Sequence, residues 1–352
     1  MGLIPNKDYA DVKPAYSTIR RTIPRVDLRV DRISRARRWG PCDMLKRSIK
    51  NFGKRCVRRL FEAGQFFGFD VLPRHFYSEI PSISELRATT SWRRPYPLTH
   101  VAGATIEQQI ECFQQICPKG LFDKDRAFEI HASASKLNGE SGFGPVEANV
   151  LHAFIQKVRP KKIVQIGCGV STAVILDAAG RSEYKPRLFC IEPYPSVYLR
   201  GLNSSGTIEL VPVRVQDEIP KVTELLRDSD FFFVDSTHTL GPAGEVSRII
   251  IELLPCIPKG SWAHFHDITF PYDYGRRVLT SELFFNHESS LLLAFLTMND
   301  RFALRLSLAM LHYLASDAIS ETIPDYEPAG NEGGLQSSDG HFPSSAYLQR
   351  MA

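Results

Sequence analysis

The segment that decides the fold reads KIVQIGCGVST and spans residues 162–172. Its first half is apolar and largely β-branched, which is typical of a strand buried on both faces of a parallel sheet. Gly167 and Gly169 then allow a sharp turn and leave room for a ligand to approach the backbone. Ser171 and Thr172 can cap a helix, and the residues after them favour one. This order of strand, glycine turn and helix predicts a nucleotide-type binding site in a doubly wound fold.

The rest of the chain alternates between apolar runs with strand character and segments with helical patterns. We predict six further strands, at residues 187–192, 208–215, 231–235, 261–265, 302–307 and 345–349. We predict helices at residues 44–67, 105–117, 145–158, 243–254 and 291–296. The alternation of strands and helices indicates an α/β fold with a largely parallel sheet.

The domain organisation follows from shifts in composition along the 352 residues, of which 43% are hydrophobic. We expect a basic, flexible arm at residues 1–40 and a helical, loop-rich extension at residues 41–141. The α/β domain should then occupy residues 142–352, which is enough chain for a sizeable core. Residues 317–343 are rich in Gly, Pro, Ser and acidic residues, so we predict a long surface loop there.

The basic residues are concentrated near the N-terminus. Residues 20–59 hold 15 Lys or Arg and three Asp, a net charge of +12, whereas the whole chain carries +4; the remainder is therefore −8. Such a segment can bind weakly to an anionic membrane surface or simply be a solvated tail. It can also attract phosphates. Few aromatic residues lie among the charges, so we expect no nucleic-acid partner.

The composition also bears on the compartment. No apolar run approaches the ~18 residues that a transmembrane helix needs, and the first residues lack the apolar core of a signal peptide. The seven cysteines are scattered, odd in number and form no Cys-x-x-Cys pair. We therefore expect a reduced, cytoplasmic protein. The sequence does not indicate an oligomeric state.

Two acidic residues follow the second and third predicted strands. Glu192 stands where a carboxylate can accept both hydroxyls of a ribose. Asp217 can face an adenine edge or be an ordinary surface residue. A nicotinamide site would have a third glycine where this chain has Thr172. Glycine turns after strands are common, so a purely structural turn is the alternative to a ligand site.

Histidines and carboxylates close the fourth and fifth predicted strands, in the segments DSTH at residues 235–238 and HFHD at residues 264–267. Both strand ends lie on the ligand-binding edge of an open α/β sheet. We regard Asp235, His266 and Asp267 as candidate catalytic residues, with an ion-paired structural cluster as the alternative. His264 lies further inside its strand, where a hydrogen-bonded core histidine is an equal interpretation.

The chain resembles a known family at several short segments. They are GFGP (142–145), QIGCGVST (165–172), IEPYP (191–195), VDSTH (234–238), HFHDI (264–268), FPYDY (270–274) and, in the N-terminal part, PRHFYS (73–78). Together they resemble the class I S-adenosylmethionine-dependent methyltransferases, and more narrowly the bacterial methyltransferase-24 type. The resemblance covers roughly residues 70–350.

The resemblance implies a seven-stranded sheet whose last strand is antiparallel, and S-adenosylmethionine as the cofactor. It implies that the methionine part lies against the glycine turn and that Glu192 holds the ribose. We therefore expect the cofactor-binding residues to be Gln165, Gly167, Gly169, Ser171, Thr172, Glu192, Asp217 and Asp235. The family usually has a carboxylate where this chain has Gln165, which offers only a dipole to a positively charged cofactor.

The expected reaction is O-methylation of a small-molecule or saccharide hydroxyl. Asp235, His266 and Asp267 can bind a divalent ion such as Mg²⁺ that lowers the pKa of the acceptor. His266 can instead act as a general base. The alternatives are a cofactor-binding scaffold or surface adaptor without catalysis, and a metal-dependent hydrolase, since His-x-His-Asp is half of a metal-binding motif.

Overall fold

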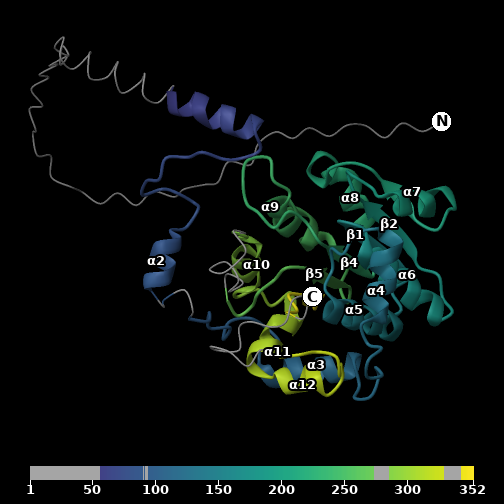
Figure 1. Ribbon diagram of the computed structural model, residues 1–352. Helices are drawn as coiled ribbons and strands as arrows, with labels where there is room; N and C mark the ends of the chain where they lie inside the picture. The colour runs from purple at the N-terminus through teal and green to yellow at the C-terminus, as the bar shows by residue number, and fades with distance from the viewer. Residues whose placement is uncertain (1–55, 90, 92–93, 273–284, 329–341) are drawn as a thin grey trace, which may run out of the picture. The chain divides into compact units, whose positions relative to one another are not determined.

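The computed structural model describes residues 56–89, 91, 94–272, 285–328 and 342–352. Contacts divide the chain into two units, Met1–Ser78 and Glu79–Ala352 (Figure 1). In the first unit residues 56–66 are helical, which confirms the described part of the helix predicted at residues 44–67. The expected arm at residues 1–40 lies outside the described residues.

The second unit is built on a seven-stranded sheet. Its strands are β1 (Lys162–Ile166), β2 (Arg187–Ile191), β3 (Glu209–Val211), β4 (Phe231–Val234), β5 (Trp262–Phe265), β6 (Phe302–Ser307) and β7 (Ala346–Arg350). Their order across the sheet is β3-β2-β1-β4-β5-β7-β6. Only β7 runs antiparallel to its neighbours, β5 and β6. The predicted doubly wound, mostly parallel sheet with an antiparallel last strand is confirmed.

The register of the central strands brings the predicted site residues to one edge of the sheet. Ile166, the last residue of β1, pairs with the last residue of β2 and with the last residue of β4. Val234 of β4 pairs in turn with Phe265 of β5. The residues that follow these strands therefore leave the sheet side by side, as expected for the carboxyl edge of parallel strands.

Helices cover both faces of the sheet (Figure 1). One hydrophobic cluster lies between the sheet and α3 (Ile106–Ile116), α4 (Glu129–Asn138), α5 (Pro145–Val158), α6 (Val170–Arg181) and α7 (Val197–Ser204). A second cluster lies between the other face and α8 (Ile219–Leu226), α9 (Val246–Arg248), η3 (Ile249–Leu253), η4 (Leu254–Cys256) and α10 (Glu288–Leu296). The remaining short helices are α2 (Ile83–Ala88), η2 (Val215–Asp217), α11 (Leu308–Leu314) and α12 (Ser316–Ser320).

Helix α5 carries a glutamate into the site, and its local sequence explains where it begins. Gly144 has an extended backbone before the helix, and Pro145 occupies the first turn, where its missing N–H costs nothing. The Gly144 N–H donates to the carboxylate of Glu147, 3.2 Å away. This bond fixes the Glu147 side chain over the first turn. The helix ends at Val158, and its C-cap, Arg159, stands just before Pro160.

By contacts, the second unit begins at Glu79, because α3 and α4 bury side chains in the same core as α5 and α6. The domain boundary expected at residue 142 stays a prediction. Two expectations about local structure differ from the structure. The helix predicted at residues 243–254 is divided among α9, a π-helical turn and a 3₁₀ turn that contains Pro255. The loop predicted at residues 317–343 begins with α12, and Ile319, Ile323 and Tyr326 are buried there. Residues 329–341 of that loop lie outside the described part of the chain.

Candidate active site

The glycine turn after β1 lies against the end of β4. Gly167 has φ 73°, and a Cβ built on it would lie 1.8 Å from the backbone oxygen of Asp235. A side chain at this position would therefore force the two strand ends apart. The turn needs glycine here for its backbone conformation and for the close approach of a second chain segment.

A pocket of about 200 Å³ opens beside this turn. Its lining includes the turn from Gly167 to Gly169 with Ser171, the carboxylates Glu192 and Asp235, and Phe143 from the segment before α5. Glu192 is half-buried and accepts hydrogen bonds from the N–H groups of Cys168 (3.2 Å) and Tyr194 (2.8 Å). The acid predicted to hold a ribose is therefore fixed at the mouth of the turn.

Gln165 and Thr172 lie beneath the turn and do not line the pocket. The Gln165 amide donates to the Gly167 carbonyl (3.1 Å) and to the Ser171 hydroxyl (2.8 Å), and accepts from the Thr172 hydroxyl (2.9 Å). A carboxylate could not donate the first two of these bonds, which gives a physical reason for glutamine at this position. In the structure both side chains hold the turn, and their expected contact with a cofactor stays a prediction.

Asp217 is separate from the pocket. It ends η2, is exposed, and pairs with Arg214 at 2.9 Å. The pocket described above is lined without it. The surface interpretation of Asp217 fits the structure better than the expected contact with an adenine.

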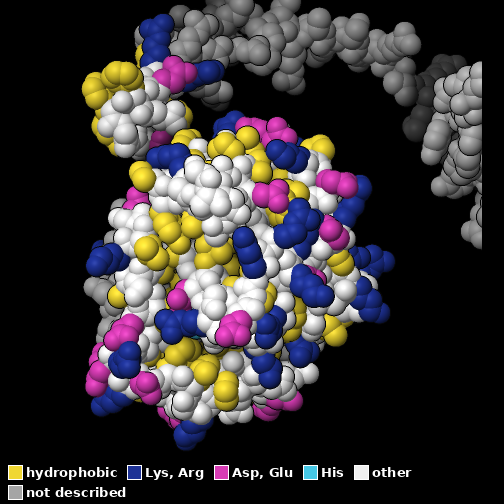
Figure 2. All heavy atoms as spheres, turned by 90° about the vertical axis from the view of Figure 1, so that its right-hand side faces the viewer, with side chains coloured by type: hydrophobic (Ala, Val, Ile, Leu, Met, Phe, Trp, Pro, Cys, Tyr) yellow, Lys and Arg dark blue, Asp and Glu magenta, His cyan; other side chains and the backbone are white. Residues whose placement is uncertain are grey.

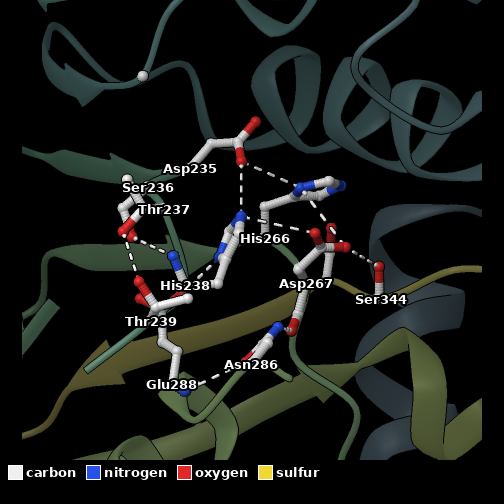
Figure 3. Close-up of polar contacts among 12 residues, drawn as sticks. Asp235, Ser236, Thr237, His238, Thr239, His266, Asp267, Asn286, Glu288 and Ser344 are labelled. Atoms are coloured by element: carbon white, nitrogen blue, oxygen red, sulfur yellow. Dashed lines mark hydrogen bonds and ion pairs between the residues drawn. The ribbon is translucent and has the colours of Figure 1, made fainter. Parts of the chain in front are cut away.

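Asp235, His266 and Asp267 come together at the ends of β4 and β5, as predicted, and His238 joins them. In Figure 3 the four side chains point toward one another. The Asp235 Oδ1 atom lies 3.2 Å from His266 Nδ1 and 3.3 Å from His238 Nε2. Asp267 lies 3.5 Å from His238 Nε2 and 3.8 Å from His266 Nδ1 through its two carboxylate oxygens. Asp235 also lines the pocket, so this cluster borders the space beside the glycine turn.

Two buried glutamates form an outer ring that sequence reasoning missed. Glu288 Oε2 lies 2.6 Å from His238 Nδ1, and Glu147 Oε2 lies 3.2 Å from His266 Nε2. Glu147 precedes β1 and Glu288 lies at the start of α10, so neither belongs to a strand end. The capping position of Glu147 after Gly144-Pro145 was a signal that could have been noticed, whereas no local pattern marks Glu288.

Burial and charge act in opposite directions on the pKa values in this cluster. Burial alone would lower the pKa of His238, but its bonds to Asp235 and Glu288 outweigh burial and raise the pKa to about 10. Burial acts to lower the pKa of His266 as well. The carboxylates of Glu147 and Asp235 outweigh burial and hold this pKa well above its usual value. Burial acts to raise the pKa of Asp235, yet the two histidines hold it below its usual value. The cluster is therefore stabilised by pairs of opposite charge.

His264 is a core residue. It is fully buried and stacks on Phe233, with ring centroids 4.3 Å apart, and Tyr347 packs edge-on against it. Neither of its ring nitrogens has a hydrogen-bond partner among the described residues. The core interpretation of His264 is correct, although the hydrogen bonds expected with it are absent from that part of the chain.

Part of the chain matches a known family, and the chain is similar to several known proteins. A family model described as a methyltransferase domain matches residues 164–268. An uncharacterized protein of Archaeoglobus fulgidus is 31% identical over 199 residues, which cover 53% of this chain and 84% of that protein. The O-methyltransferase TomG from Streptomyces achromogenes, solved with S-adenosylmethionine, is 13% identical and covers 66% of this chain and 93% of that chain, with a TM-score of 0.39. An O-methyltransferase from Bacillus cereus in complex with S-adenosylhomocysteine is 12% identical and covers 70% of this chain and 100% of that chain, with a TM-score of 0.41.

The sheet order, the antiparallel β7 and the glycine turn after β1 define a methyltransferase fold of the Rossmann-like kind. The chain belongs to the class I S-adenosylmethionine-dependent methyltransferases, in the methyltransferase-24 type. Among the described residues, no helix combines the length and the apolar character needed to cross a membrane.

Proposed function

We propose that the protein transfers a methyl group from S-adenosylmethionine to a hydroxyl of a small molecule or saccharide. The observation that carries this proposal is the position of Asp235. Its carboxylate lines the pocket beside the glycine turn and also contacts both histidines of the neighbouring cluster. A donor site and a group of polar side chains able to activate an acceptor therefore share one residue.

The residues of the pocket fit the proposed cofactor. S-adenosylmethionine supplies, when bound, a methyl group on a positively charged sulfur. Glu192 offers a half-buried carboxylate that can accept ribose hydroxyl hydrogens while the Cys168 and Tyr194 N–H groups hold it in place. Ser171, at the start of α6, also lines the pocket and offers its hydroxyl to the rest of the molecule.

The cluster of Asp235, His266 and Asp267 would hold and activate the acceptor. Methyl transfer needs donor and acceptor in near-attack geometry, which side chains fixed by several partners can provide. Asp267 is held by the Ser344 hydroxyl at 2.9 Å, and His266 by carboxylates on both ring nitrogens. The carboxylates can receive the hydroxyl proton directly, and His266 can do so once it has lost its own proton. Alternatively, the cluster can bind a divalent ion that lowers the pKa of the acceptor.

Methyl transfer itself tests the proposal. The full-length protein would be incubated with S-adenosylmethionine labelled in its methyl group and with pools of small-molecule and saccharide hydroxyls. We expect label in an acceptor, and we expect Asp235→Asn and Asp267→Asn to lose transfer while still binding cofactor. Full transfer by the double variant Asp235→Ala/His266→Ala would contradict the role of the cluster. Cofactor binding without transfer to any acceptor would favour the scaffold interpretation.

A chelator separates the two ways of activating the acceptor. If an ion is required, the chelator should abolish transfer and an added divalent ion should restore it. If His266 acts as a base, the chelator should have no effect, and transfer should increase with pH as the imidazole loses its proton.

A further inference from the structure

The residue of the cluster that the sequence did not single out is His238, and its backbone is strained. His238 has φ 61° and Asp267 has φ 54°, both in the left-handed region that side chains rarely adopt. One short segment stabilises both turns. The N–H groups of His287 and Glu288 donate to the His238 carbonyl, at 3.0 and 3.3 Å, and the Asn286 side chain donates to the Asp267 carbonyl at 3.1 Å. Strain of this kind persists where surrounding structure holds it and is concentrated at functional positions.

The separations among the four side chains fit ligands of one ion. Their nearest donor atoms lie 3.2, 3.3, 3.5 and 3.8 Å apart. Ligands at bonds of ~2.1 Å stand ~3.0 Å apart in an octahedral site and ~3.4 Å apart in a tetrahedral one. Atoms of Asp235, His238 and His266 all lie within 4.8 Å of one another. A single ion can therefore reach these atoms with small movements of the side chains.

The carboxylates of Glu288 and Glu147 also support a metal site. His238 turns Nε2 toward Asp235 and gives Nδ1 to Glu288, whereas His266 turns Nδ1 toward Asp235 and gives Nε2 to Glu147. Histidine ligands of metals commonly donate their second ring nitrogen to a carboxylate, which fixes the ring and the tautomer. Glu147 is itself held, at 2.8 Å by the Ser345 hydroxyl and at 3.0 Å by the Ser344 N–H. A lone ion pair does not need such an outer ring on both histidines.

The charge of the cluster also favours a cation. Four carboxylates, those of Asp235, Asp267, Glu147 and Glu288, surround two imidazoles. Even with both imidazoles protonated, ionised carboxylates would outnumber positive charges by two. Glu147 and Glu288 are almost completely buried, so water provides little compensation. A divalent ion would bind the two imidazoles in their neutral form, so it would carry the same charge as the two protons that it displaces and would bring that charge within bonding distance of Asp235 and Asp267.

The geometry points to a centre of two histidines and two carboxylates, His238, His266, Asp235 and Asp267, that binds a divalent transition metal such as Mn²⁺, Fe²⁺, Co²⁺ or Zn²⁺ in preference to Mg²⁺. Glu288 and Glu147 are its positioning residues. The inference rests on the proposed function, since this ion would border the pocket of the methyl donor. Imidazole nitrogen suits these metals, whereas Mg²⁺ prefers an all-oxygen set and retains its waters.

Direct metal binding tests the inference without any turnover. Full-length protein freed of metal would be titrated with Co²⁺, followed by its visible ligand-field absorption, and with Mn²⁺ and Mg²⁺ by calorimetry. We expect one Co²⁺ per chain, bound at least tenfold more tightly than Mg²⁺. His238→Ala should lose that affinity and change the Co²⁺ spectrum, with His238→Gln as a second variant should the first fail to fold.

The role of Glu288 as a positioning residue is tested by the affinity of its variants for Co²⁺ and by their melting temperatures. Glu288→Gln should weaken Co²⁺ binding by about 10- to 100-fold with an unchanged melting temperature, and Glu288→Asp should restore part of the loss. His152 provides the matched control, since it is another buried histidine paired with a carboxylate, Asp177 at 3.0 Å, away from the cluster. His152→Ala should leave metal binding unchanged.

Two results would overturn the inference: Mg²⁺ binding as tightly as Co²⁺, or Co²⁺ binding that His238→Ala and His238→Gln leave intact. S-adenosylmethionine would be titrated in parallel. A protein that binds the cofactor but no transition metal contradicts the inference alone. A protein that binds the metal but not the cofactor contradicts the proposed function.

Discussion

Gly167 shows at the scale of one residue how the glycine turn depends on its neighbour. An alanine at this position would adopt the φ of 73° at a cost of about 1–2 kcal/mol in stability. The clash of its Cβ with the Asp235 backbone would add to this cost. Gly206 has a similar φ of 69° but nothing near its would-be Cβ, so it isolates the backbone term. We expect Gly167→Ala to lower the free energy of unfolding clearly more than Gly206→Ala, measured by urea denaturation. Equal losses would show that the close approach to Asp235 is unimportant.

His264 gives the clearest pH dependence of stability. Burial, with the nearby positive charge of His266, lowers its pKa to about 3, whereas the unfolded chain has a value near ~6.5. The unfolded state therefore binds an extra proton between these values, so stability is complete above pH ~6.5 and decreases as the pH falls toward 3. By linkage, the loss from pH 7.5 to pH 5 is about 2 kcal/mol.

The variant His264→Phe removes this titration and keeps an aromatic ring in the same place. We expect the stability of His264→Phe relative to the natural chain to rise by about 2 kcal/mol between pH 7.5 and pH 5. Urea denaturation at both pH values measures it. Parallel pH profiles for the two proteins would show that His264 does not titrate as its surroundings indicate.

The site was predictable from sequence only where strand ends supply it. Glu192, Asp235, His266 and Asp267 each follow a strand with a clear apolar pattern, and parallel strands must bring such residues to one edge. Glu147 and Glu288 come from helices 119 and 50 residues away from the histidines they contact. Such contacts depend on how helices pack on the sheet, which no local pattern records. Gln165 belongs to β1, and the bonds of its side chain to the turn could not be deduced from the sequence.

At the scale of elements, all seven strands were predictable because buried parallel strands are short apolar runs between turns. The helices were less predictable from the sequence than the strands. The predicted ends of α5 agree with the structure since Gly144, Pro145 and Pro160 mark them. Helix α4 was missed because only Ala134 of its ten residues is buried, so it shows almost no apolar face. The division of the helix predicted at residues 243–254 into three helical types reflects packing that the 3.6-residue pattern does not contain.

The end of the helix at residues 56–66 and the segment after it expose several aromatic side chains. Phe66, Phe67, Phe76 and Tyr77 are all at least 71% exposed. Aromatic rings next to basic residues favour the interface of an anionic membrane. We expect the full-length protein to sediment with anionic vesicles in low salt, and less so as salt screens the charges.

Replacing the aromatics tests their part in that binding. Phe66→Ser/Phe67→Ser/Phe76→Ser should weaken vesicle binding, whereas Met298→Ser, an exposed apolar residue of the other unit, should not. Binding that is insensitive to salt would contradict the electrostatic attraction. On the face of the molecule seen in Figure 2, Lys and Arg are interspersed with Asp and Glu, so no extended basic patch offers a competing surface there.

At the scale of the whole molecule, the chemistry should need only the unit from Glu79 onward. The glycine turn, the pocket and the cluster all lie in that unit. We expect a protein lacking residues 1–40 to keep its methyl-transfer rate, measured with the acceptor found for the full chain, while its vesicle binding decreases. A folded truncation with a large loss of transfer would assign the arm a role in the reaction.

The measurement that tests the central claim most directly is calorimetric titration of the full-length protein with S-adenosylmethionine and, separately, with NAD. The account predicts binding of S-adenosylmethionine in preference to NAD. Glu192→Ala should weaken it by about 1.5–3 kcal/mol, the range for hydrogen bonds to a charged group, while Asp217→Ala leaves it unchanged. A preference for NAD, or an affinity for S-adenosylmethionine that Glu192→Ala does not alter, would contradict the account.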